Sequence, residues 1–290
     1  MLKSVVVFLM VCVPLLANAN TDFFTVKQSA VLANATYANK TDMDQQLSPA
    51  GFTVLHHKEL AASQVSYFLA SKGGVQYVAI RGTANVQNAL LDLDVQLNPD
   101  ADLKIVLHQG FSLAAKAIYQ DLLPFLNSKT RTQTQIHTTG HSLGGAVAVI
   151  VAMYLQHDGY NVQNVITFGQ PKVTNVSGAR AFENMPLTRV VTPLDMVPLV
   201  PPLSPLQLQD LDIYWHLGQE VILLDKHQHA VTGGIKSMLR ATKFVSALPD
   251  EKNLQAHQMS TYLDLINSNL QYSEEVEHKT GISLFGLSLD

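Results

Sequence analysis

Polar and hydrophobic positions in the first third of the chain follow a strand pattern. Three short apolar runs are bounded by polar or glycine residues, as β-strands are, at residues 52–55, 65–70 and 75–80. Gly73 and Gly74 separate the last two runs, and a glycine pair between two strands favours a tight hairpin turn. Ahead of the strands, residues 29–37 predict a helix, which a polar turn region follows up to Pro49.

From about residue 100 onward, strand patterns alternate with helical patterns. The short strand-like runs lie at residues 105–107, 134–139, 165–168, 187–192 and 220–224. The helical patterns cover residues 110–126, 145–153, 179–184, 235–247 and 254–267. This alternation is typical of a mostly parallel sheet with helices on both faces, so the sequence predicts an α/β fold.

A glycine-rich turn connects the strand at residues 134–139 to the apolar helix at residues 145–153. Its sequence, G-H-S-L-G-G, contains the pattern G-x-S-x-G around Ser142. In a nucleophile elbow this pattern holds a serine hydroxyl above a sheet on a tight strand-to-helix turn. The alternative interpretation is a glycine-rich turn in which Ser142 only caps the helix. The strand before the turn and the helix after it favour an elbow, and with it the α/β-hydrolase architecture.

A serine nucleophile needs a base, and the base needs an acid that orients it. In α/β-hydrolases these residues follow in the order Ser, Asp or Glu, His. Asp195 comes just after the strand at residues 187–192, where the acid should emerge, although it could instead cap a turn before Pro198. His257 lies at the start of the last helical segment. Four other acids fit the strand-end position less well: Asp210, Asp212, Glu220 and Asp225.

The remaining histidines after Asp195 give weaker signals. His216 precedes a strand and is expected to be structural. His227 and His229 have the H-x-H spacing that can hold a metal, but no third ligand is evident, so a polar loop is the favoured interpretation. The sequence therefore predicts neither a metal nor a cofactor.

Composition narrows the class of protein further. Of 290 residues, 47% are hydrophobic and 14% are charged, which favours a substantial core. The net charge of −4 and the absence of a basic stripe argue against nucleic acid as a partner.

The first nineteen residues have the form of a secretory signal peptide. Lys3 is followed by an apolar stretch at residues 5–16 and by Ala17-Asn18-Ala19, which resembles a cleavage site. An uncleaved anchor is the alternative. Cys12 is the only cysteine and lies inside this segment, so the mature domain, residues 20–290, has no cysteine nucleophile. We expect one exported domain, secreted or periplasmic.

Eight motifs between about residues 75 and 265 resemble, in order, those of the class 3 lipases, which include the fungal triacylglycerol lipases. They are R-G-T at residues 81–83, Asp92, H-Q-G-F at 108–111, the elbow at 140–145, F-G-Q-P-K-V-T-N at 168–175, D-M-V-P at 195–198, Y-W-H-L-G-Q-E at 214–220, and H-Q-M-S-T-Y at 257–262. The resemblance implies an α/β-hydrolase fold with Ser142, Asp195 and His257 as the catalytic triad. It also implies an oxyanion hole formed by the backbone N–H groups of Thr83 and Leu143, assisted by the Thr83 hydroxyl.

In the family, the segment after Thr83 holds a lid helix that opens at a lipid surface. Residues 84–93 have an apolar helical face that suits a lid and equally suits a helix packed on the core. Ala89 stands where the family often has tryptophan. At the other end of the chain, apolar residues at 282–289 predict either a closing strand or a contact with a membrane or partner.

Together these features predict a secreted serine ester hydrolase. It would cleave acyl glycerides or related lipid esters through an acyl-enzyme, without a cofactor and with transient contact to a lipid interface. Phospholipase A1 and a small-ester carboxylesterase are alternatives within this chemistry. An exported lipid-binding protein without catalysis is an alternative of another class, against which the complete set of Ser, Asp and His argues.

Overall fold

The computed structural model describes residues 21–60, 65–83, 96–126, 131–201, 213–234, 237 and 250–278, with the pairs 283–284 and 287–288. The predicted signal peptide at residues 1–19 and the lid segment at residues 84–93 lie outside the described residues. So does the predicted helix at residues 235–247, apart from Ser237.

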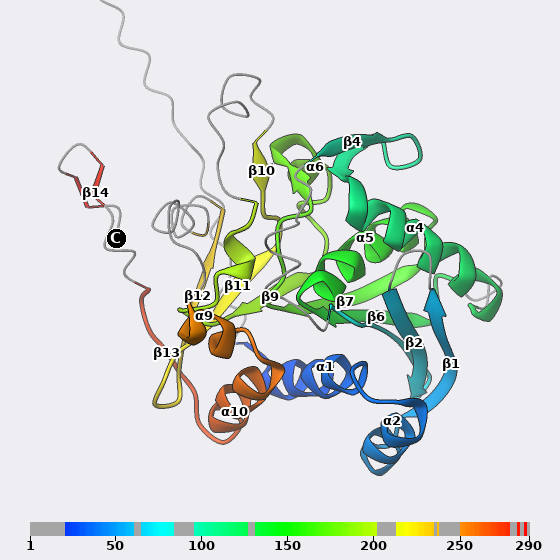
Figure 1. Ribbon diagram of the computed structural model, residues 1–290, viewed down its shortest axis with the longest axis horizontal. Coiled ribbons are helices and arrows are strands. Elements are labelled where there is room, and N and C mark those ends of the chain that lie inside the picture. The colour runs from blue at the N-terminus through cyan, green and yellow to red at the C-terminus, as the bar shows by residue number, and fades with distance from the viewer. Residues whose placement is uncertain are drawn as a thin grey trace, which may run out of the picture.

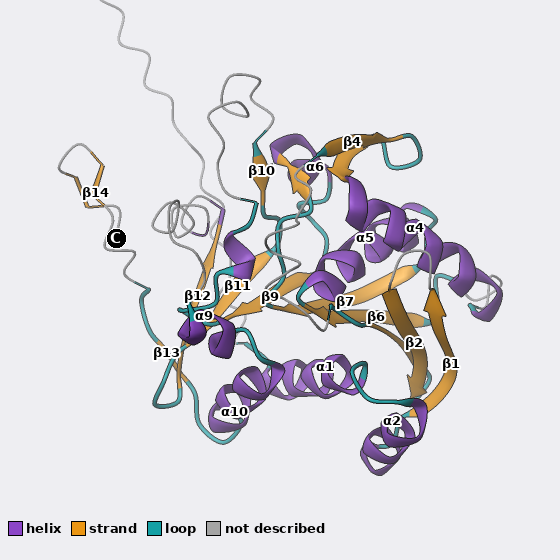
Figure 2. Cartoon of the chain, in the orientation of Figure 1, coloured by secondary structure: helices purple, strands orange, loops and turns teal. Residues whose placement is uncertain are grey.

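A large, mostly parallel sheet forms the centre of the described structure (Figure 2). Its nine strands, in spatial order, are β1 (Thr53–Leu60), β2 (Val65–Lys72), β3 (Val75–Ile80), β6 (Gln135–His141), β7 (Asn161–Phe168), β9 (Leu187–Val191), β11 (Gln219–Leu223), β12 (Gln228–Gly233) and β13 (Glu274–Glu275). Strands β3, β6, β7, β9 and β11 are parallel to their neighbours in this series. The carboxyl ends of these strands therefore meet at one edge, where α/β proteins place their sites.

Helices cover both faces of the sheet (Figure 1). On one face lie α4 (Gln109–Leu122) and α5 (Leu143–His157), and on the other lie α1 (Phe23–Ala35), α2 (Lys40–Leu47) and α10 (Met259–Asn269). Helix α5 is buried from Gly144 to Leu155, because it packs between α4 and the sheet. This position explains why its sequence is apolar on all sides.

Smaller elements complete the described structure. A four-stranded sheet contains β10 (Tyr214–Trp215), β8 (Thr174–Asn175), β5 (Ile105–His108) and β4 (Leu97–Asp100). The remaining short helices are α6 (Val176–Ala181), α9 (Glu251–Ala256) and the 3-10 turns η1 (Ser48–Ala50), η3 (Leu123–Phe125) and η5 (Val197–Leu199). None of the helices described here is long and apolar enough to cross a membrane.

The predicted α/β class and the central strands are confirmed, and the strand at residues 75–80 has the predicted bounds. Gly73 and Gly74 both have positive φ in the β2–β3 turn, as expected of a hairpin. Other elements differ: the early helix begins at Phe23 and not at residue 29, and the first strand extends to Leu60. The polar turn region before Pro49 contains helix α2, which Asn39 caps and which buries only Met43 and Leu47. Two buried positions give too weak a stripe to be recognised in a sequence.

The other differences lie toward the C-terminus. His229 is not in a polar loop but is buried in β12, although His227 does lie in the turn before it. The helix predicted at residues 254–267 is two helices, α9 and α10, with a break at His257. The tail strands β14 (Ser283–Leu284) and β15 (Leu287–Ser288) pair with each other, and β13 borders the main sheet in their place.

Candidate active site

The site lies at the carboxyl ends of the central parallel strands. Ser142 directly follows β6, Asp195 follows β9 after three residues, and His257 lies between α9 and α10. All three side chains are buried, with exposed fractions of 3% for Ser142, 0% for Asp195 and 1% for His257. The fold thus gathers at one edge three residues that are far apart in the sequence.

Ser142 has the backbone conformation of a nucleophile elbow. Its φ is 59° and its ψ is −133°, which a non-glycine residue adopts only under strain of about 1–3 kcal/mol. The glycines on either side let the turn close. A Cβ at Gly140 would lie 2.4 Å from the Gly144 carbonyl oxygen, and one at Gly144 would lie 2.3 Å from the Ile80 oxygen. Any larger residue at either position would therefore push the serine away from the sheet.

Asp195 and His257 form a direct contact. The Nδ1 atom of His257 lies 2.8 Å from Oδ2 of Asp195. The same oxygen accepts a 2.5 Å hydrogen bond from the Tyr262 hydroxyl, and Oδ1 accepts the Val197 backbone N–H at 2.9 Å. Burial alone would raise the pKa of Asp195, but His257 and these two donors outweigh it and hold the pKa below its ordinary value. The carboxylate is therefore ionised at neutral pH and oriented on both oxygens.

The other ring nitrogen of His257 remains available. Nε2 is buried and has no hydrogen-bond partner among the described residues, and none joins it to Ser142. The serine is nevertheless close, because its backbone N–H donates to the Phe168 carbonyl at 2.9 Å. Gly169, the next residue, packs against both Asp195 and His257. An imidazole with Nδ1 on a carboxylate and a free Nε2 beside a serine can act as a general base.

Gly169 is part of the site because nothing larger fits there. Its φ is +56°, and a Cβ would lie 2.7 Å from Asp195 Oδ2 and 2.8 Å from His257 Nδ1. In the sequence, Gly169 was noted only as part of the F-G-Q-P segment. Tyr262 was noted only as the last residue of the H-Q-M-S-T-Y motif. Neither residue was predicted to contact Asp195.

The two residues expected to form the oxyanion hole, Thr83 and Leu143, belong to segments that contact or adjoin Ser142. Leu143 is the first residue of α5, so the helix itself does not use its N–H, and the positive end of the helix dipole points at the same place. Thr83 follows Gly82, which packs on the elbow so closely that a Cβ there would lie 2.5 Å from the His141 carbonyl oxygen and 3.1 Å from Ser142 Cβ. Gly82 therefore brings Thr83 next to the serine.

Other polar residues hold the loops around the site. The buried Lys172 donates to the Leu199 and Pro201 carbonyls in the loop that follows Asp195. His216 lies 2.6 Å from the Pro198 carbonyl, which agrees with the structural role expected of it. Within the part of the chain that the structure describes, no group of three or more His, Cys, Asp or Glu residues could hold a metal.

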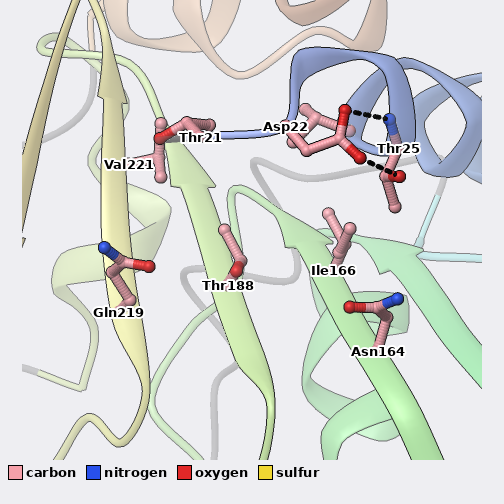
Figure 3. A pocket seen from close by; sticks show the side chains of 9 residues that line it. Thr21, Asp22, Thr25, Asn164, Ile166, Thr188, Gln219 and Val221 are labelled. Atoms are coloured by element: carbon pink, nitrogen blue, oxygen red, sulfur yellow. Dashed lines mark hydrogen bonds between the residues drawn. The ribbon is translucent and has the colours of Figure 1, made fainter. Parts of the chain in front are cut away.

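A cavity of about 260 Å³ lies away from these residues (Figure 3). It is lined by residues of α1 and of strands β7, β9 and β11, and among them are Asp22, Asn164, Thr188 and Gln219. Thr188 and Gln219 lie at the amino ends of their strands, opposite to the edge that carries Ser142 and Asp195. Both oxygens of Asp22 already bind the first turn of α1. This cavity is therefore separate from the candidate active site.

Comparison with known structures identifies the fold. The structure of the Rhizomucor miehei triacylglyceride lipase superposes with a TM-score of 0.62 at 19% identity, covering 70% of this chain and 80% of that one. The elbow at the end of a parallel strand and this likeness define the α/β-hydrolase fold.

Comparison of sequences shows which family the chain resembles. Residues 77–204 match the model of the class 3 lipases. A lipase from Rhizopus niveus is 28% identical over 196 residues, which cover 63% of this chain and 50% of that protein. The secreted mono- and diacylglycerol lipase 1 of Fusarium solani is 35% identical over 101 residues, which cover 34% of this chain and 30% of that protein. Residues 77–204 are therefore similar to the class 3 lipases, and the chain spans half or less of the length of these relatives.

Proposed function

We propose that this protein is an exported serine ester hydrolase that cleaves acyl glycerides or related lipid esters. The observation that carries the proposal is the contact of His257 Nδ1 with the Asp195 carboxylate, which leaves His257 Nε2 without a hydrogen-bond partner among the described residues. An imidazole held in this way is suited to take a proton from a hydroxyl. The names of the lipase relatives support the lipid character of the substrate.

The proposed reaction has two halves. As the Ser142 Oγ attacks the ester carbonyl carbon, His257 Nε2 takes the hydroxyl proton, and the carbonyl oxygen becomes an oxyanion that the N–H groups of Thr83 and Leu143 stabilise. When the tetrahedral intermediate collapses, the bond to the alcohol oxygen breaks and His257 returns the proton to that leaving group. A water molecule then repeats the sequence on the acyl-enzyme and releases the carboxylic acid. Asp195 keeps the imidazole in the required tautomer throughout.

Two further parts of the proposal come from the sequence. Residues 1–19 would direct export and then be removed, which leaves a domain that begins at residue 20. The apolar face of residues 84–93 would contact a lipid interface transiently. The Fusarium relative, which is named as a secreted lipase, supports export.

A substrate panel tests the proposal. The mature protein would be assayed on p-nitrophenyl esters of increasing chain length, emulsified triacylglycerol and phosphatidylcholine vesicles, and labelled with a fluorophosphonate. We expect hydrolysis of long-chain esters and labelling of Ser142, both lost in Ser142→Ala and retained in Ser48→Ala, a control at an exposed serine. Preference for phospholipid would indicate a phospholipase A1, and preference for short esters a carboxylesterase. Absence of both hydrolysis and labelling would overturn the proposal in favour of lipid binding without catalysis.

A further inference from the structure

His141, the residue before the elbow serine, connects two parts of the site. Its side chain is buried, with an exposed fraction of 4%. The Nε2 atom lies 2.7 Å from the backbone carbonyl oxygen of His257, and Nδ1 lies 2.8 Å from the hydroxyl of Tyr37. The two imidazole rings lie 4.4 Å apart between their centroids. His141 therefore contacts the candidate base directly.

The partners of His141 determine which of its nitrogens carries the proton. A carbonyl oxygen can only accept, so Nε2 must be the donor. Burial, reinforced by the neighbouring His257, lowers the pKa of His141 to about 3, so the ring is neutral and Nδ1 is an acceptor. Burial also raises the pKa of Tyr37, whose hydroxyl is therefore protonated and donates to Nδ1.

Tyr37 also contacts the segment that carries Thr83. Its hydroxyl lies against Gly82, where a Cβ would come within 2.7 Å of it. Tyr37 and His141 therefore connect this segment, through two hydrogen bonds, with the backbone of the candidate base.

The backbone of His257 needs such an anchor, because it lies where the short helix α9 ends and α10 has not yet begun. Two other side chains tie α9 to the acid loop. Thr192 Oγ1 donates to the Ala256 carbonyl at 3.1 Å, and Asn253 Nδ2 donates to the Leu194 carbonyl at 2.9 Å. Only His141, among the side-chain bonds described, holds the backbone of residue 257 itself.

We propose that His141 is a positioning residue, which fixes the His257 backbone so that Nε2 faces Ser142, and that Tyr37 holds the His141 ring in the required orientation. This inference rests on the proposed function. The ring also has to be uncharged, because His257 becomes a cation when it takes the serine proton and a second cation at this distance would oppose that step. A neutral imidazole supplies the donor without the charge.

Three variants separate positioning from folding. His141→Leu removes the donor, His141→Gln keeps an N–H donor at a similar distance from the backbone, and Tyr37→Phe removes only the hydroxyl. A displacement of about 1 Å in a catalytic group can reduce the rate by roughly a hundredfold. We therefore expect kcat to fall about 30- to 100-fold in His141→Leu with KM within about twofold, about threefold to tenfold in Tyr37→Phe, and less than about fivefold in His141→Gln.

Labelling with a fluorophosphonate to completion would count the active sites. Each rate would be divided by that count, so that unfolded molecules do not lower it. His137→Leu, a half-buried histidine on the same strand, is the matched control and should keep the wild-type kcat per labelled site. A wild-type protein that neither hydrolyses esters nor is labelled would overturn the proposed function. An active wild type with His141→Leu and Tyr37→Phe both within about twofold of its kcat would overturn the positioning role alone. If His141→Leu does not fold, the kcat of Tyr37→Phe alone decides whether the positioning role holds.

Discussion

The hydroxyl of Tyr262 lies 2.5 Å from Oδ2 of Asp195, the same oxygen that contacts His257 Nδ1. Tyr262 and Asp195 both have an exposed fraction of 0%, so water does not compete for this bond. Tyr262 comes from α10, which begins two residues after His257. The segment that carries the base therefore also orients the acid.

Replacing Tyr262 by Phe should weaken catalysis without disrupting the fold. The change removes one of the donors that hold the pKa of Asp195 low, so that pKa should rise. The carboxylate would also lose part of its orientation, and we expect kcat to fall about tenfold. Ester hydrolysis measured from pH 3 to pH 8 checks this, and the variant should lose its activity at a higher pH on the acid side than the wild type does. Tyr272→Phe, at an exposed tyrosine, should match the wild type, and a Tyr262→Phe profile that also matched it would contradict the prediction.

Gly169→Ala should abolish activity through the contact between Asp195 and His257. The new methyl group would lie 2.7 Å from the carboxylate and 2.8 Å from the imidazole, so one of them must move. We expect kcat/KM to fall at least about a hundredfold, because small displacements of catalytic groups have large effects. Ester hydrolysis and the rate of fluorophosphonate labelling measure the loss.

Gly74→Ala is the matched control for this variant. Gly74 also has a positive φ, of +82°, but a Cβ there would meet nothing within 4 Å. It should therefore lose about 1 kcal/mol of stability from backbone strain and keep its activity. Equal losses of activity in the two variants would mean that strain, and not the displaced pair, is responsible.

The contrast between the elbow and the hydrogen bonds around it shows which parts of the site can be predicted from the sequence. The elbow could be predicted because its serine, its glycines, the strand before it and the helix after it lie within one short segment. The hydrogen bonds of Tyr262 to Asp195, Tyr37 to His141 and His141 to His257 join residues 67, 104 and 116 positions apart. No local pattern encodes contacts over such separations.

The same reasoning explains which elements of the fold could be predicted from the sequence and which could not. Strand β3 could be predicted because its apolar run has clear limits and a glycine pair before it. His229 was assigned to a loop because its neighbours Lys226 and Gln228 are polar. Its burial comes from distant partners, since it packs edge-on against Phe23 and its Nδ1 lies 2.8 Å from the Ser273 hydroxyl.

The stability of the protein should depend on pH through His141. Its pKa is about 3 in the folded protein and close to 6.5 in the unfolded chain, so between these values the unfolded chain binds a proton that the folded protein does not. Stability therefore rises with pH in this window, by about 1.4 kcal/mol per unit, and decreases as the pH falls below 6.5. In His141→Gln this contribution is absent. We expect any stability advantage of the wild type over that variant to shrink by about 2 kcal/mol between pH 7 and pH 5.

Urea unfolding of both proteins at pH 7, 6 and 5 would measure this difference. Other buried histidines titrate equally in the two proteins and cancel in the comparison. A difference for His141→Gln that does not change with pH would show that His141 accepts a proton in the folded state.

Thr83→Val tests whether the hydroxyl of Thr83 stabilises the oxyanion. Valine keeps the shape of the side chain and the backbone N–H but removes the hydroxyl donor. Loss of one oxyanion donor typically reduces kcat by about a hundredfold or more, and a hydroxyl that only assists two amides should contribute less, so we expect about a 10- to 100-fold decrease. KM should stay within about twofold, because the charge develops only in the transition state. Thr83→Ser should restore most of the rate, and Thr53→Val, at an exposed threonine on β1, should have no effect. If kcat of Thr83→Val stayed within about twofold of the wild type, the hydroxyl would have no part in the oxyanion hole, which would then consist of the two backbone amides.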